Sequence, residues 1–187
     1  MCAFCGVMKI IGFIYSNGGG RKAKGEWEMV LKGDSCLLNG RKPFFMPDWS
    51  QEIGVTPCMI LRVSRLGKEI APKFAERYYD ATAPGEDFIA LDKAREAQAA
   101  GRPWTEALAF DYSLAIGEWM DKGEGRMAKG DWLMRPEEAI SEASKVMTIR
   151  QGDLIYIQAK QAPQPVHKED VLRIEVEGEE KLYCKIK

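Results

Sequence analysis

The chain has 187 residues, with 27 basic and 28 acidic side chains and a net charge of −1. This length suits one domain with a sizeable hydrophobic core. The balanced charge argues against nucleic acid or an anionic membrane as a partner, and no apolar run is long enough to cross a bilayer. The first 15 residues lack the basic start and the cleavage site of a signal peptide, so we expect a cytoplasmic protein. Its five scattered cysteines are then expected to be reduced thiols: Cys2, Cys5, Cys36, Cys58 and Cys184.

The pattern of apolar residues predicts a strand-rich α+β chain with a few short helices. A buried strand is expected at 10–15, followed by turns at 16–20, 32–34 and 39–40, and a second strand at 59–65. The first predicted helix begins at Pro72 and presents Phe74, Ala75, Tyr78 and Tyr79 on one face. The second covers 93–100, with Asp92 as N-cap and Gly101 as its stop. The third begins near Pro136 and presents Ile140, Ala143, Val146 and Met147. Strands at 153–158, 171–177 and 181–186, with a loop at 159–165, complete the chain.

Several landmarks follow one another at characteristic spacings. They are Lys42-Pro43-Phe44-Phe45, Arg65-Leu66-Gly67-Lys68, 73–80, 85–88, Gly101-Arg102-Pro103-Trp104, Ala109-Phe110-Asp111 and 148–155. In this order they closely resemble the fumarylacetoacetate hydrolase family, as a short bacterial-type member, and an ordered set is more specific than any single motif. The resemblance covers 9–187 as one catalytic-type domain, so 1–8 is expected to be a leader extension, and Met1 and Met8 both remain candidate starts.

The resemblance implies the family's β-rich fold, a mixed β-sandwich roll, and a homodimer. It also implies enzymes that hydrolyse, decarboxylate, hydrate or isomerise small oxo-acids such as acylpyruvates or β-diketo acids, with Mg²⁺ or Mn²⁺ as the cofactor. Of the metal ligands, the family's two strand glutamates correspond to Thr56 and Cys58, and only the aspartate is kept, as Asp87. Since Mg²⁺ needs several oxygen ligands, no metal is expected unless other carboxylates rebuild the site. Of the nearby candidates, Glu52 lies before the strand, and Glu86 should face away from Asp87 in an extended segment.

Other positions that the family uses for chemistry are also replaced. The family's arginine corresponds to Leu91, and the lysine that would hold the oxo-acid corresponds to Leu108. Without such cations the charge that develops during the reaction is not stabilised. The loop that would grip the substrate carboxylate, at 157–160, has lost its glycine and with it a close backbone approach to an anion. The remaining candidates for a substrate pocket are Asp111, Ser113 and Ile157.

Three functions remain open from the sequence. The first is a family protein that is inactive by the metal-dependent mechanism, needs no cofactor and acts through binding or as a partner subunit. The second is a hydrolase, isomerase or decarboxylase of small oxo-acids with a rebuilt site near Asp87. The third is a small-ligand sensor with an apolar pocket lined by Leu91, Leu108 and Ile157. The single histidine, His167, is expected in an exposed turn and not as a general base.

Overall fold

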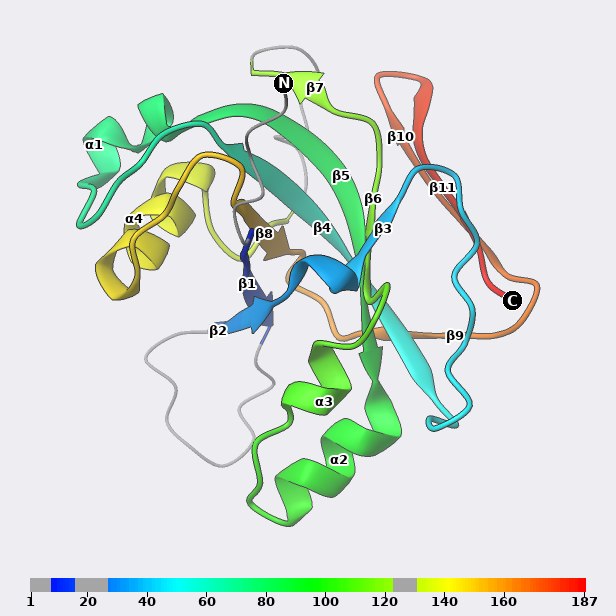
Figure 1. Ribbon diagram of the computed structural model, residues 1–187. Coiled ribbons are helices and arrows are strands. Elements are labelled where there is room, and N and C mark those ends of the chain that lie inside the picture. Colours follow the sequence, from blue (N-terminus) through cyan, green and yellow to red (C-terminus); the bar gives the residue numbers. More distant parts are fainter. Residues whose placement is uncertain (1–7, 16–26, 123–130) are drawn as a thin grey trace, which may run out of the picture.

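The computed structural model describes residues 8–15, 27–122 and 131–187 (Figure 1). The predicted leader, the turn at 16–20, Cys2 and Cys5 therefore lie outside the described residues, apart from Met8. One sheet contains β1 (Ile10–Tyr15), β2 (Trp27–Lys32), β3 (Leu37–Asn39), β4 (Ile53–Val63), β5 (Tyr79–Ala90), β6 (Leu114–Ile116), β7 (Met120–Asp121), β8 (Leu154–Gln158) and β9 (Gln164–Val166). A separate hairpin pairs β10 (Val171–Val176) with β11 (Glu179–Lys185). The helices are α1 (Pro72–Ala75), α2 (Leu91–Ala99), α3 (Thr105–Leu108) and α4 (Pro136–Val146), with short 3-10 turns at Asp34–Cys36 and Glu76–Tyr78.

The large sheet is mixed, as predicted. Its path is β2-β1-β8-β4-β5-β6-β3, with β9 paired to β4 and β7 paired to β5. The pairs β1–β8 and β3–β6 are parallel, and the other pairs in the sheet are antiparallel. The β-rich α+β architecture with a few short helices is therefore confirmed. None of the described helices has the length and apolar character needed to cross a membrane.

Two hydrophobic cores lie on the two faces of the central strands. On β4, Cys58 and Ile60 belong to one core, which the β10–β11 hairpin helps to cover, and Met59 and Leu61 belong to the other, beneath α4. Figure 1 shows α1 and α4 at one side of the long strands β4 and β5, with the hairpin at the other. Successive side chains of a strand point to opposite faces. A polar side chain in the middle of β4 or β5 is therefore covered by one of the two cores, whichever face it is on.

Pro57 lies inside β4, although proline is disfavoured in a central strand because it has no N–H to donate. One edge of β4 pairs with β5 throughout, whereas the other pairs with β9 at Ile53–Val55 and with β8 from Cys58 onward. The carbonyl of Pro57 accepts a hydrogen bond from the N–H of Ala159 on that second edge, at 2.9 Å. The missing N–H therefore faces the same edge, where β8 has just ended and the carbonyl of Ala159 accepts the N–H of Gln161 instead.

The predicted helices need correction in three places. The helix from Pro72 ends at Ala75, and Tyr79 is already the first residue of β5. Asp92 is not the N-cap of α2, because Ala90 takes that place and the helix begins at Leu91. Further along, Gly101 adopts a φ of 62° just beyond α2, which agrees with the predicted stop. The α4 prediction is right for Ile140 and Ala143, which are buried, but Val146 is 64% exposed.

The strand predictions at 10–15, 153–158, 171–177 and 181–186 agree with β1, β8, β10 and β11 to within two residues at each end. The strand predicted at 59–65 is confirmed, but β4 begins six residues earlier, at Ile53. The segment 159–165 was predicted as a loop, yet its end forms β9 against β4. At the start of β8, the Asp153 carboxylate accepts hydrogen bonds from the N–H groups of Arg150 and Lys9, so it fixes the turn before the strand.

Candidate functional site

The retained aspartate, Asp87, lies in the interior of β5 and is only 1% exposed. Lys32, the last residue of β2, places its Nζ 2.7 Å from Asp87 Oδ1, and its side chain is completely buried. On the other side, Gln158 Nε2 donates a hydrogen bond to Asp87 Oδ2 at 2.7 Å. Both carboxylate oxygens of Asp87 therefore face a donor from a different strand.

These two partners of Asp87 are themselves held in place. Lys32 Nζ donates to the backbone carbonyl and to Oγ of Ser113, at 3.0 and 2.9 Å. Ser113 Oγ in turn donates to the carbonyl of Leu108 at 3.1 Å. The amide oxygen of Gln158 accepts the backbone N–H of Tyr15 at 2.8 Å. Lys32 thus uses two of the three N–H donors of its ammonium group on Ser113, and the same group contacts Asp87 Oδ1 as an ion pair.

Thr56 and Cys58, which correspond to the lost glutamates, lie on the same face as Asp87. Thr56 is directly opposite Asp87 in the β4–β5 register, and Cys58 is opposite Gly85 on β5 and Gln158 on β8. Both side chains are completely buried. Burial raises the pKa of the Cys58 thiol well above its ordinary value, and the charges of Asp87 and Glu86 raise it further. At neutral pH these two positions therefore add no charge to the site.

Tyr156 fills the space beside this cluster. Its ring lies so close to β1 that a Cβ atom on Gly12 would come within 2.1 Å of the ring carbon Cζ, so this position requires glycine. Burial, followed by the charge of Asp87, raises the pKa of the Tyr156 hydroxyl well above its usual range. Thr56 Oγ1 is buried without a hydrogen-bond partner among the described residues. The face that carries Asp87 is thus lined by neutral polar groups and one ion pair.

Glu86 follows the expectation that it would face away from Asp87. It is opposite Pro57 in the register, and its charge acts on Cys184, a core residue of β11. Glu86 is 5% exposed, and its Oε2 has no hydrogen-bond partner in the described part of the chain. Burial is the main cause that raises the pKa of Glu86 to about 8, with a smaller contribution from the charge of Asp87. Glu86 is therefore a protonated acid in the core at neutral pH.

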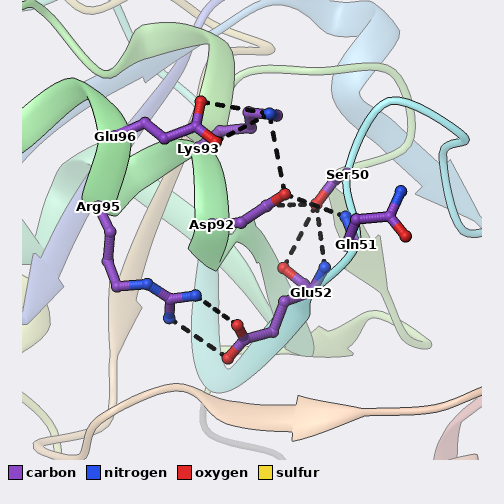
Figure 2. A network of polar contacts seen from close by, with 7 residues as sticks. All are labelled: Ser50, Gln51, Glu52, Asp92, Lys93, Arg95 and Glu96. Atoms are coloured by element: carbon purple, nitrogen blue, oxygen red, sulfur yellow. Dashed lines mark hydrogen bonds and ion pairs between the residues drawn. The ribbon is translucent and has the colours of Figure 1, made fainter.

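Glu52 takes part in a separate network that joins the loop before β4 to α2 (Figure 2). Its carboxylate forms an ion pair with Arg95 on the exposed side of α2. Next to it, the Asp92 carboxylate accepts hydrogen bonds from Ser50 Oγ at 2.7 Å and from the Gln51 N–H at 3.0 Å. Figure 2 shows the two carboxylates held by different partners, that of Glu52 by Arg95 and that of Asp92 by Ser50 and Gln51. Asp92 therefore anchors a loop, and Glu52 is not part of the cluster around Asp87.

The residues around Asp87 do not fit a family-type Mg²⁺ or Mn²⁺ ion. Residues 8–15, 27–122 and 131–187 contain no group of three or more His, Cys, Asp or Glu side chains that could hold a metal. Asp87 is paired with Lys32, which already neutralises its charge. A hard divalent cation would meet a hydroxyl, a protonated thiol and an amide, which are poor replacements for its hydration shell.

The other sequence candidates are spread over the fold. Ser113 and the carbonyl of Leu108 belong to the Lys32 cluster. Ile157 is completely buried in the core beneath α4, on the opposite face from Gln158, whereas Leu91 and Leu108 pack with the other core. Asp111 is exposed and lines a surface recess of about 710 Å³ together with Trp49, Lys93, Glu96, Glu106, Ala109 and Phe110. The three residues of the predicted apolar pocket therefore do not share one face.

Two site residues were missed from the sequence. Lys32 was predicted in a turn, but it closes β2 and points into the sheet, and Gln158 was considered only as part of a degenerate loop. The single local signal for Lys32 is its position at the end of the strand-like run Trp27–Lys32, which is followed by Gly33. His167, by contrast, lies in an exposed turn as predicted, with a side chain that is 80% exposed.

Neither the protein-family models nor the curated proteins give a match to this sequence. Solved structures do match. A candidate fumarylacetoacetate hydrolase family protein from Yersinia pestis CO92 has a TM-score of 0.81 at 20% identity, over 97% of this chain and 93% of its own. A 5-carboxymethyl-2-hydroxymuconate delta-isomerase from Mycobacterium smegmatis has a TM-score of 0.78 at 18% identity, over 96% and 78%.

A fumarylpyruvate hydrolase from Pseudomonas aeruginosa, solved with Mn²⁺ and pyruvate, has a TM-score of 0.76 at 16% identity, over 96% of this chain and 88% of its own. These similarities extend over nearly the whole described fold, although few residues are identical. The sheet order, the two cores and these matches lead to the same conclusion. The chain has the fold of the fumarylacetoacetate hydrolase family.

Proposed function

We propose that this protein is a divergent member of the fumarylacetoacetate hydrolase family that does not use the family's metal-dependent chemistry. It acts instead as a cytoplasmic binding or partner subunit, in a homodimer. The observation that carries the proposal is the charge of the site: Thr56 and Cys58 are neutral, and Lys32 neutralises Asp87. A site without surplus negative charge has nothing with which to attract a divalent cation.

The residues that would act on an oxo-acid support the same proposal. Leu91 and Leu108 stand at positions where the family resemblance implies cations, and both pack against the hydrophobic core. In such surroundings a developing enolate or carboxylate would be neither paired nor solvated. Asp87 is engaged by Lys32 and Gln158 and is not free to act as a general base.

The alternative is a hydrolase, isomerase or decarboxylase with a rebuilt metal site. The observation in favour of this alternative is the similar fold of the fumarylpyruvate hydrolase from Pseudomonas aeruginosa, which was solved with Mn²⁺ and pyruvate. It requires replacement carboxylates beside Asp87. Glu86 is on the other face of β5, and Glu52 is paired with Arg95 at the surface, so neither meets that requirement.

Thermal unfolding with increasing Mg²⁺ or Mn²⁺ tests the proposal. We expect no rise in the melting temperature at millimolar metal, because a ligand that does not bind the native state cannot stabilise it. The Pseudomonas aeruginosa fumarylpyruvate hydrolase, measured in parallel, serves as the metal-binding control. A rise of several degrees in the present protein that Asp87→Ala abolishes, together with turnover of acylpyruvate or fumarylacetoacetate, would establish the alternative.

The subunit assembly can be measured directly. We expect sedimentation equilibrium to give twice the mass of the 21.0 kDa chain. Large apolar side chains that remain exposed on the single chain, such as Phe45 at 67%, Leu66 at 69% and Val146 at 64%, are consistent with a surface that is covered in solution. A mass of one chain at micromolar concentration contradicts the homodimer.

A further inference from the structure

We propose that a surface formed by the loop after β4, by α1 and by the end of α4 binds an acidic segment of another protein. We define this α1–α4 surface as the exposed side chains of residues 65–77 and 145–150. The inference rests on the proposed function, because it names the kind of partner that a binding subunit with this fold would take. The surface shares no residue with the cluster around Asp87.

Backbone contacts hold the parts of the α1–α4 surface together. Gly67, in the loop after β4, forms an antiparallel bridge with Ile149, in the segment that follows α4, through hydrogen bonds of 3.0 and 2.9 Å. Just before this loop, the Ser64 N–H donates to the carbonyl of Tyr78 at 2.9 Å. α1 itself packs against α4, and Figure 1 shows both helices at one side of the long strands. Side chains from three separate segments of the chain therefore lie next to one another.

Five exposed cations of this surface form no ion pair with any residue that the structure describes. They are Arg65, Lys68, Lys73, Arg77 and Arg150. Lys68 Nζ donates to the backbone carbonyl of Lys145 at 3.0 Å, at the end of α4. Lys73 Nζ and Arg77 Cζ lie over the ring of Phe74, at 4.9 and 5.4 Å from its centroid. These contacts are with neutral groups, so the positive charges of the surface remain uncompensated.

Exposed apolar side chains lie among these cations. Leu66 is 69% exposed, Val146 is 64% exposed and Phe74 is 43% exposed. Large apolar side chains that are grouped on a surface mark an interaction site, and arginine and aromatic residues are enriched in protein interfaces. The surface therefore fits a partner segment that presents carboxylates around an apolar residue.

Carboxylates within the surface favour such a segment over a continuous polyanion. Glu69 is exposed beside Lys68, and Glu76 is paired with Lys122 at 3.3 Å. The whole chain also has a net charge of −1. A nucleic acid or an anionic membrane carries negative charge over its whole face and would be repelled by these carboxylates. A short acidic segment can contact the cations alone and leave the carboxylates of the surface in water.

A second copy of this chain is a less suitable occupant, although it too would cover Leu66 and Val146. A twofold contact brings the same surface of both subunits together. Here it would place Arg65, Arg77 and Arg150 opposite the same cations of the second subunit, and like charges across an interface repel one another. We therefore expect the homodimer contact on another surface.

Fluorescence anisotropy tests the inference with the full-length chain and a labelled synthetic peptide in which glutamates surround a leucine and a phenylalanine. We expect binding that weakens as salt is added, because salt screens exposed charges. The variant R65Q/R77Q/R150Q should bind the peptide about tenfold more weakly, since three exposed charge pairs are lost. The matched variant K42Q/R102Q/K168Q removes the same charge from exposed cations elsewhere and should bind like wild type.

A second variant and a second peptide separate the apolar contribution from the charge. L66S/V146S keeps all cations, so it should bind the peptide more weakly while the dependence on salt stays the same. A peptide with glutamines in place of the glutamates should lose both the affinity and the dependence on salt. Thermal unfolding of each variant shows that the exposed substitutions leave the chain folded.

Four results would overturn the inference. They are no salt-sensitive binding of the acidic peptide, equal loss of binding in the two triple variants, tighter binding to phosphatidylserine vesicles or a DNA duplex than to the peptide, and a fall of R65Q/R77Q/R150Q to the mass of one chain. The last would identify the surface as the homodimer contact. Failure of the proposed function looks different, because it appears as a rise in melting temperature with Mn²⁺ in the unaltered chain.

Discussion

Replacing Lys32 by methionine is expected to lower the free energy of unfolding by about 3–5 kcal/mol, the range found when one partner of a buried ion pair is removed. The change leaves the Asp87 carboxylate in a completely buried position with Gln158 as its remaining charge-stabilising donor. It also removes the group that satisfies the carbonyl and hydroxyl of Ser113. Urea denaturation followed by circular dichroism measures the loss.

Two matched variants show whether this loss comes from the buried charge. The double variant K32M/D87N has no uncompensated charge, so it is expected to be more stable than K32M alone. Lys145→Met breaks an exposed pair with Glu142 on α4 and should stay within about 1 kcal/mol of wild type. Two results would contradict a stabilising role of the ion pair. The first is a K32M variant whose free energy of unfolding equals that of Lys145→Met, and the second is a K32M/D87N variant that is less stable than K32M.

The elements that could be predicted from the sequence are those whose burial leaves a local pattern. β1 and β8 are short apolar runs that end at polar or turn residues, and the predicted bounds of both agree with the structure to within one residue. β5 was missed, although at 12 residues it is longer than any other described strand. Its middle reads Pro84-Gly85-Glu86-Asp87, and these residue types are depleted in strands. Pairing with β4 along nearly its whole length overrides that local preference.

The site was predictable only in part, for a related reason. Strand alternation and the family resemblance together placed positions 56, 58 and 87 near one another, and the register confirms that they share a face. The partners of Asp87 are 55 and 71 residues away in the sequence, at Lys32 and Gln158. No local spacing connects such residues, because their contact depends on the curvature of the whole sheet. The sequence therefore indicated what the site has lost but not what replaced it.

Glu86→Gln is expected to stabilise the protein increasingly as the pH rises. In the folded chain the pKa of Glu86 is raised to about 8, chiefly by burial, from an ordinary value of 4.5. Between these values the folded state keeps a proton that the unfolded chain releases. The stabilising contribution of the protonated acid is therefore complete below pH 4.5 and decreases up to about pH 8, by about 1.4 kcal/mol per unit.

Glutamine has nearly the shape of the protonated acid but no proton to lose, so the variant should lack this slope. Urea unfolding of wild type and E86Q at several values from about pH 5 to about pH 8 should give curves that diverge, with E86Q the more stable at the alkaline end. Parallel curves over this range would mean that Glu86 is solvated or paired when ionised. Divergence would instead show that a carboxylate next to the retained Asp87 is kept neutral by the core, and so is unavailable to a metal at neutral pH.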